Sequence, residues 1–212
     1  MSAAADRTAP FPSAGQRRAA DTLGMFVFLT SEVMLFGGLF AMLAFDRIRH
    51  PAAAAAASQH LSLAIGTANT GILLTSSLCV ALAGLAARNG RLRGATQGLL
   101  AAAALGVLFL VLKGVEYRID YDEGLASLTG APSPLGSSPA QLFIGLYYVA
   151  TILHALHVSA GVVLLTGAGL GVARGRLPLP GRAETVHLVG LYWHLVDVIW
   201  VFLFPLLYLA RP

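Results

Sequence analysis

Five long apolar stretches, separated by short polar segments, dominate the hydropathy pattern of this chain. They are Leu23–Phe45, Leu61–Ala87, Ala95–Tyr117, Ala140–Ala173 and Val186–Leu209. Each is long enough to cross a bilayer as an α-helix, which takes about 20 residues. None alternates between apolar and polar positions, and backbone groups in lipid must form their hydrogen bonds internally. The pattern therefore predicts an all-α bundle of five transmembrane helices.

The composition also indicates an integral membrane protein. Of the 212 residues, 57% are hydrophobic and 11% are charged, whereas soluble domains carry about 25% charged residues. Residues 1–22 are polar and are predicted to form an N-terminal arm, with one transmembrane domain over residues 23–212. The first apolar stretch exceeds the usual signal-peptide core of about 7–15 residues. It also carries Glu32, so we interpret it as a retained span.

Arginine residues between the stretches indicate how the helices are oriented. If the N-terminus is cytoplasmic, nine arginines lie on that side: Arg7, Arg17, Arg18, Arg88, Arg91, Arg93, Arg174, Arg176 and Arg182. Four lie on the other side, namely Arg47, Arg49, Arg118 and Arg211, together with Asp120, Asp122 and Glu123. The positive-inside rule then predicts a cytoplasmic N-terminus and a periplasmic C-terminus in a bacterial inner membrane. This bias accounts for the net charge of +4 without a nucleic-acid partner.

Two connecting segments carry further expectations. Residues 118–139 contain the Gly-, Ser- and Pro-rich run "GAPSPLGSSP" and are predicted to form an exposed outer loop. The alanine run after His50 is expected to extend the second helix outward, because alanine has the highest helix propensity. Cys79 is the only cysteine, so no disulfide can form within the chain.

Several polar residues lie inside the predicted spans, where an ionisable side chain costs about 2.5–3.5 kcal/mol. They are Glu32, Asn69, Lys113, Glu116, His154, His157, His194 and Asp197. The last four form two pairs spaced three residues apart, on the fourth and fifth spans, and each pair shares a helix face. Tyr192, Trp193 and Trp200 accompany the second pair and are expected to pack against neighbouring helices or lipid.

These residues allow three interpretations. The one we favour is an intramembrane polar cluster of His154, His157, His194 and Asp197, because buried polar groups in lipid pair with one another. A haem or metal site is the second, but no HExxH or cysteine-rich ligand spacing accompanies the histidines. Proton handling by Glu32 is the third, since a low dielectric favours the neutral form of a carboxyl group.

The remaining ionisable groups, Lys113 and Glu116, are expected to form a self-neutralising structural pair near the outer interface. No residue pattern points to a catalytic nucleophile or to a metal ligand set in this chain. The residues alone therefore favour a partner subunit over a self-contained enzyme.

Five motifs, one on each span and in order, resemble subunit III of the haem-copper oxidases. They are "LGMFVFLTSEVMLFGGLF" from Leu23, "ANTGILLTSS" from Ala68, "KGVEY" from Lys113, "LHALHVSAG" from Leu153 and "GLYWHLVDVIWVFLFPLLYL" from Gly190. The last resembles the family's Tyr-Trp-His-Phe-x-Asp-x-x-Trp run, with Leu195 in place of phenylalanine. Lys113 stands where the family usually has glutamine. The chain resembles the short five-helix bacterial form.

The resemblance implies a non-catalytic subunit of a cytochrome c or quinol oxidase, which reduces dioxygen and translocates protons. Haem and copper would reside in partner subunits I and II and not in this chain, with subunit I as the main contact and a small subunit IV as a further neighbour. It also implies bound structural phospholipid, support of proton uptake, and a carbodiimide-reactive carboxyl group at Glu32. An accessory subunit of nitric oxide reductase with the same fold is the alternative.

Overall fold

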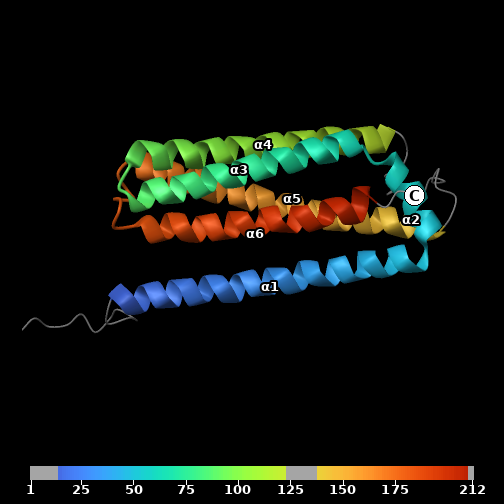
Figure 1. Ribbon diagram of the computed structural model, residues 1–212, viewed down its shortest axis with the longest axis horizontal. Helices are drawn as coiled ribbons and strands as arrows, with labels where there is room; N and C mark the ends of the chain where they lie inside the picture. The colour runs from blue at the N-terminus through green and yellow to red at the C-terminus, as the bar shows by residue number, and fades with distance from the viewer. Residues whose placement is uncertain (1–13, 123–137, 210–212) are drawn as a thin grey trace, which may run out of the picture.

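The computed structural model describes residues 14–122 and 138–209, and these residues form six α-helices (Figure 1). The helices are α1 (Ala14–Arg49), α2 (Pro51–His60), α3 (Leu63–Arg88), α4 (Leu92–Asp122), α5 (Ser138–Ala173) and α6 (Ala183–Tyr208). All except α2 are long and apolar enough to cross a membrane. The predicted all-α class and the five spans are confirmed.

Three boundaries differ from the prediction. Helix α1 begins at Ala14, inside the segment predicted to be an arm. Helix α4 continues to Asp122, so the first residues of the predicted outer loop are helical; residues 123–137 of that loop lie outside the described residues. The continuation has a physical reason, because Asp120 is buried and accepts hydrogen bonds from tyrosines of α5.

The alanine run forms a helix of its own and does not extend the second span. Pro51 begins α2 at the position where proline is best tolerated, and the chain becomes extended at Leu61. Ser62 then caps α3, and its hydroxyl accepts a hydrogen bond from the Ile65 amide at 3.5 Å. A capping serine directly before an apolar run starts a new helix, which explains the break.

Helices α3, α4, α5 and α6 form a four-helix bundle in which each packs against two neighbours (Figure 1). Helix α1 lies outside this bundle along α5 and α6, and the short α2 lies across one end. Arg47 fixes α1 to the last turn of α6, where its guanidinium donates to the Leu209 carbonyl at 3.1 Å and to the Pro205 carbonyl at 3.4 Å. A cation at this position also complements the helix dipole.

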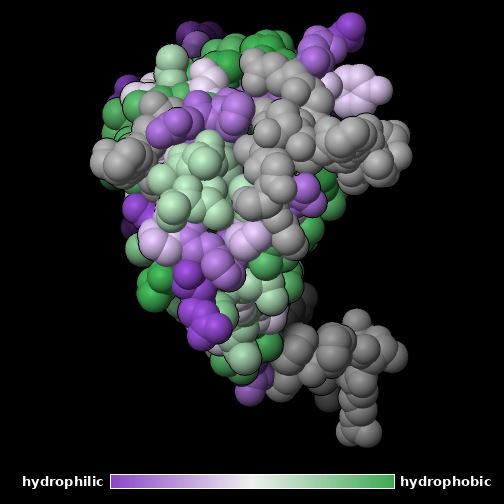
Figure 2. All heavy atoms as spheres, turned by 90° about the vertical axis from the view of Figure 1, so that its right-hand side faces the viewer, coloured by the Kyte–Doolittle hydropathy of each residue, from purple (hydrophilic) through white to green (hydrophobic). Residues whose placement is uncertain are grey.

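The surface is that of a membrane protein. Large hydrophobic side chains of every long helix are exposed along the flanks, with α1 contributing the most. Figure 2 looks onto the end that holds α2, where polar side chains gather while strongly hydrophobic ones surround the margin. The start of α1, the α3–α4 turn and the α5–α6 connection lie together at the opposite end.

The core of the bundle depends on close approach around one indole ring. Trp193 of α6 is 1% exposed and lies against Gly106 of α4 and Gly161 of α5. A Cβ atom on Gly161 would stand 2.6 Å from the ring, and one on Gly106 would stand 2.7 Å from it. Small residues let transmembrane helices approach in this way.

We expect Gly161→Ala to lower the free energy of unfolding by about 1–3 kcal/mol, because the added methyl group overpacks the Trp193 contact. Thermal unfolding in mild detergent measures this. Gly145→Ala is the matched control on the same helix, since nothing lies within 4 Å of its added Cβ. The control should be neutral or stabilising by up to about 1 kcal/mol; equal losses in both variants would contradict the prediction.

Candidate functional site

The four residues predicted to form one intramembrane cluster are distributed over three separate environments. His157 pairs with α1, His194 pairs with α3, and His154 lies in the bundle core. The prediction that these four side chains form one intramembrane cluster is therefore wrong. Residues three apart on a helix differ by about 60° in direction, which is enough to turn each partner toward a different neighbouring helix.

Glu32 and His157 join α1 to α5. His157 Nε2 lies 2.9 Å from Glu32 Oε2, and its Nδ1 lies 2.8 Å from the Leu153 carbonyl oxygen. A carbonyl only accepts, so Nδ1 carries a hydrogen and the Glu32–His157 bond contains one shared proton. Tyr192 completes the site by donating to the His157 carbonyl at 3.0 Å. The pair can hold, release or accept a proton without leaving its position.

Two apolar grooves flank this pair where α1 lies along α6. One, of about 300 Å³, is lined by Met25, Phe28, Ala160, Leu164, Thr185, Leu188, Val189 and Tyr192. The other, of about 220 Å³, is lined by Val33, Phe36, Gly37, Phe40, Leu195, Val198, Ile199 and Phe202. Their linings are almost entirely apolar, so they suit hydrocarbon rather than a polar ligand.

His194 and Asp197 face α3 and share one hydroxyl group. His194 Nδ1 lies 2.6 Å from Ser77 Oγ, and the same hydroxyl hydrogen-bonds to the Asp197 carboxyl group. Ser77 belongs to the motif identified on the second predicted span, but the sequence analysis assigned it no role. Its position in a Ser-Ser pair on an apolar helix was the signal that could have identified it.

His154 is fully buried among aromatic rings. Its ring stacks on that of Trp200, with the ring centroids 5.3 Å apart, and lies edge-on to the ring of Phe109, with the centroids 5.5 Å apart. Trp200 in turn donates to Thr70 at 3.1 Å. Among the described residues, both nitrogens of His154, the amide of Asn69, Trp193 Nε1 and Asp197 Oδ1 are buried without a hydrogen-bond partner.

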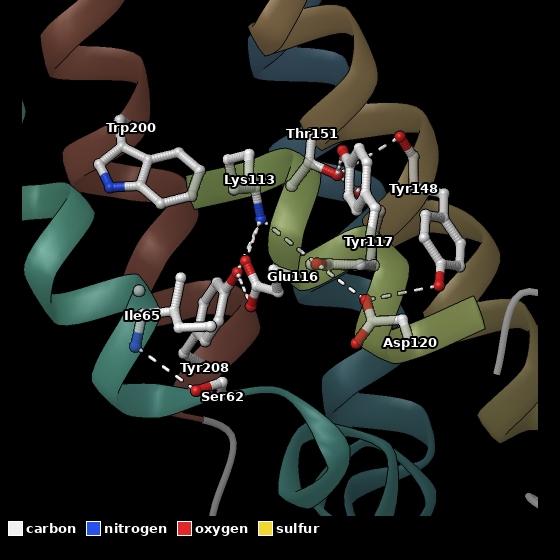
Figure 3. A network of polar contacts seen from close by, with 12 residues as sticks. Ser62, Ile65, Lys113, Glu116, Tyr117, Asp120, Tyr148, Thr151, Trp200 and Tyr208 are labelled. Atoms are coloured by element: carbon white, nitrogen blue, oxygen red, sulfur yellow. Dashed lines mark hydrogen bonds and ion pairs between the residues drawn. The ribbon is translucent and has the colours of Figure 1, made fainter. Parts of the chain in front are cut away.

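Lys113 lies at the centre of a second polar network, at the α2 end of the bundle (Figure 3). Its Nζ donates to Glu116 Oε2 at 2.8 Å, to the Tyr208 hydroxyl at 2.8 Å and to the Tyr147 hydroxyl at 3.3 Å. Tyr208 donates to the other Glu116 oxygen at 2.8 Å. Four aromatic rings, of Tyr117, Tyr147, Trp200 and Tyr208, stand with centroids 5.0–5.5 Å from Nζ.

The network extends toward the end of α4 through Asp120, which accepts from Tyr147 at 3.4 Å and from Tyr148 at 3.5 Å. Lys113 is 2% exposed and Glu116 is 1% exposed, so the pair is enclosed by protein and does not lie at an open interface. The tyrosines of α5 and Asp120 were missed by the sequence analysis. Asp120 follows Lys113 by seven residues, which places both on one helix face and was an available signal.

A metal site is not apparent in the part of the chain that the structure describes, where no group of three or more His, Cys, Asp or Glu side chains could hold an ion.

We expect Lys113→Met to destabilise the protein by about 3–5 kcal/mol, because it leaves the Glu116 carboxylate buried without its cation. Adding Glu116→Gln should restore part of the loss. Unfolding in mild detergent measures both variants, and Arg93→Met, at an exposed position, is the charge-loss control with an expected effect below about 0.5 kcal/mol. A loss no larger than that of the control would contradict the enclosed ion pair.

Comparison with known proteins agrees with the motif resemblance. The family model described as cytochrome c oxidase subunit III matches residues 16–210. Cytochrome c oxidase subunit 3 of Thermostichus vulcanus is 34% identical over 190 residues, covering 88% of this chain and 86% of the relative. The protein of the same name from Corynebacterium diphtheriae is 31% identical over 192 residues, which cover 90% of this chain and 88% of the relative.

A third relative, the "Heme-copper oxidase subunit I+III" of Aeropyrum pernix, is 30% identical over 206 residues, which are 95% of this chain and 23% of that protein. The family model covers nearly the whole chain, including the five candidate membrane spans, and the first two relatives cover 88% and 90% of it. The resemblance predicted from the five motifs is confirmed, and the chain belongs to the cytochrome c oxidase subunit III family.

Proposed function

We propose that this subunit III is a non-catalytic part of a bacterial terminal haem-copper oxidase, in which it stabilises subunit I, binds structural phospholipid and supports proton uptake. The observation that carries the proposal is the family match over residues 16–210. Electron transfer and dioxygen reduction then take place on haem and copper in subunits I and II, and this chain contributes packing, lipid and proton-holding groups. A small subunit IV is a further neighbour in the proposal.

Association with subunit I is supported by the Aeropyrum pernix relative, whose name combines subunits I and III in one chain. A fused chain holds its two parts at a fixed ratio, as a stable complex requires. The flanks of this protein expose long rows of apolar side chains, which suit either a neighbouring transmembrane helix or lipid.

Lipid binding is supported by the two apolar grooves beside α1. They follow the helix axis on either side of the Glu32–His157 pair, so an acyl chain lying along α1 would cover that pair from water. In this arrangement Tyr192 and Phe36 form part of the groove walls while also contacting His157.

Proton handling is supported by the single proton shared between Glu32 and His157. Movement of that proton between the carboxyl oxygen and the imidazole nitrogen requires no side-chain rotation. We propose that this pair buffers protons close to the subunit I surface. We also propose that the end with the α3–α4 turn and the α5–α6 connection faces the cytoplasm of a bacterium and that the C-terminus faces the periplasm, because the arginines at that end follow the positive-inside rule.

Purification of the chain from its native membranes in mild detergent tests complex membership. We expect subunits I and II, identified by mass spectrometry, together with a haem absorption spectrum and oxygen consumption. A nitric oxide reductase as the co-purifying partner would contradict the oxidase assignment and support the alternative accessory role. A coloured preparation that contains this chain alone would contradict its non-catalytic character.

We expect a hydrophobic carbodiimide to modify Glu32, because a carboxyl group that shares a proton with His157 beside apolar grooves is accessible to such a reagent from the lipid. Peptide mass mapping after labelling measures this, and Glu32→Gln should abolish the modification. Glu116 is the internal control, since protein encloses it. Labelling of Glu116 with Glu32 unmodified would contradict the assigned environments.

A further inference from the structure

A third groove, of about 230 Å³, lies between α3 and α6 and differs from the two beside α1 in its polarity. Its polar lining consists of Arg88, His187 and His194, and its apolar walls include Val80, Leu85 and Leu191. The polar and apolar parts follow one another along the helix axis. Arg88 and His187 stand at the end, and the apolar walls continue toward His194.

At the end of the groove two basic side chains meet. Arg88 Nη2 lies 3.4 Å from His187 Nδ1. A guanidinium can only donate, so this contact uses the lone pair of Nδ1 and leaves Nε2–H as a further donor. Within the described residues, no carboxylate lies within 4.0 Å of the Arg88 guanidinium. Two donors and one permanent positive charge therefore converge without an anion from the protein.

These donors lie where two apolar spans end, which is where we expect the headgroups of a bilayer. Arg88 is the last residue of α3, and His187 lies in the second turn of α6. Both long helices continue from there as apolar spans. Arg91, Arg93 and Arg182 lie in or beside the connections at the same end of the molecule, and a cluster of arginines at this depth attracts anionic headgroups.

Glycine opens the apolar part of the groove. Gly84 and Gly190 line it from the two helices, and a Cβ atom on Gly84 would meet nothing within 4 Å. A Cβ atom on Gly190 would stand 3.2 Å from Val80, so the two helices are close at the base. The space above Gly84 is unfilled by protein, and a groove of about 230 Å³ is too small for a helix, which is about 10 Å across.

We propose that this groove is a binding site for one anionic phospholipid, with its phosphate at Arg88 and His187 and an acyl chain over Gly84 between Leu85 and Leu191. The phosphate supplies the anion that the two donors lack, and the chain fills the apolar length of the groove. The site is separate from the α1 grooves, because it lies on the side of α6 that faces α3, and it does not rest on the proposed role in an oxidase.

The test is a titration of the purified full-length chain in mild detergent with phosphatidylglycerol, and with phosphatidylcholine as the zwitterionic comparison, read by native mass spectrometry. We expect one saturable site that prefers phosphatidylglycerol. Arg88→Gln should weaken binding at this site about fivefold, which corresponds to the loss of one basic residue at a membrane surface. Gly84→Leu should abolish binding at this site while every charge remains.

Two matched controls separate the site from general effects. Arg91→Gln removes the same charge from the same end but outside the groove, and it should weaken this site clearly less than Arg88→Gln does. Gly114→Leu adds the same side chain on α4 at a position with nothing within 4 Å, and it should also bind normally. Circular dichroism confirms that all four variants remain folded before they are compared.

Three results would overturn the proposal. If Arg88→Gln and Arg91→Gln weakened phosphatidylglycerol binding equally, the lipid would be held by the overall surface charge and not by a defined site. Unchanged binding by Gly84→Leu would mean that no acyl chain lies in the groove, and competition by inorganic phosphate at equal affinity would mean a free-anion site. A photo-crosslinker in place of Leu191, in the groove wall, should couple to lipid in the native complex; coupling to a protein chain would also overturn the proposal, because a partner subunit would then cover the groove.

Discussion

The bundle depends on the need to satisfy a lysine ammonium group inside a membrane. Lys113 and Glu116 neutralise each other within α4, but their remaining donors and acceptors are met only by Tyr147 from α5 and Tyr208 from α6. Removing α5 or α6 would leave hydrogen-bonding groups of this buried ion pair unsatisfied, which costs about 1–3 kcal/mol for each group and more where the group is charged. Trp200 and the tyrosine rings surround the ammonium with aromatic faces, which adds cation–π attraction. The α2 end of the bundle is therefore held by hydrogen bonds and charge pairing as well as by side-chain packing.

Helix α1, in contrast, is attached to the bundle at a few separate points. Only a small part of its surface is buried in the protein, and its polar anchors to the bundle are few: the Glu32–His157 pair near the middle and Arg47 on the carbonyls of α6. Between these anchors the interface is formed by rings and aliphatic side chains that leave two grooves. A helix fastened at separate points can accommodate lipid beside it without losing its position.

The sequence predicted the spans because apolar length is a local property, and it predicted the family because five motifs recur in order. It failed where the outcome depends on which helices become neighbours. The spacing of His154 and His157 indicates a shared face. However, His157 pairs with Glu32 of α1, whereas His154 is enclosed by the aromatic rings of the core. Likewise, nothing local distinguishes a Lys113–Glu116 pair at an interface from an enclosed one, because the enclosing side chains are tyrosines that are common in both settings. The break between α2 and α3 depends on one capping serine within a run that otherwise favours helix.

The Glu32–His157 pair has a consequence for the synthesis of the protein. The two residues are 125 positions apart, so at about 5–20 residues per second the carboxyl group waits about 6–25 s for its partner to be made. During this interval α1 is in the membrane with an unmatched acidic group, and the helices that will neighbour it are still on the ribosome. Docking of α1 must therefore follow the formation of the α5–α6 surface, although α1 is the first helix translated. The first helix to be translated is therefore among the last to reach its final packing.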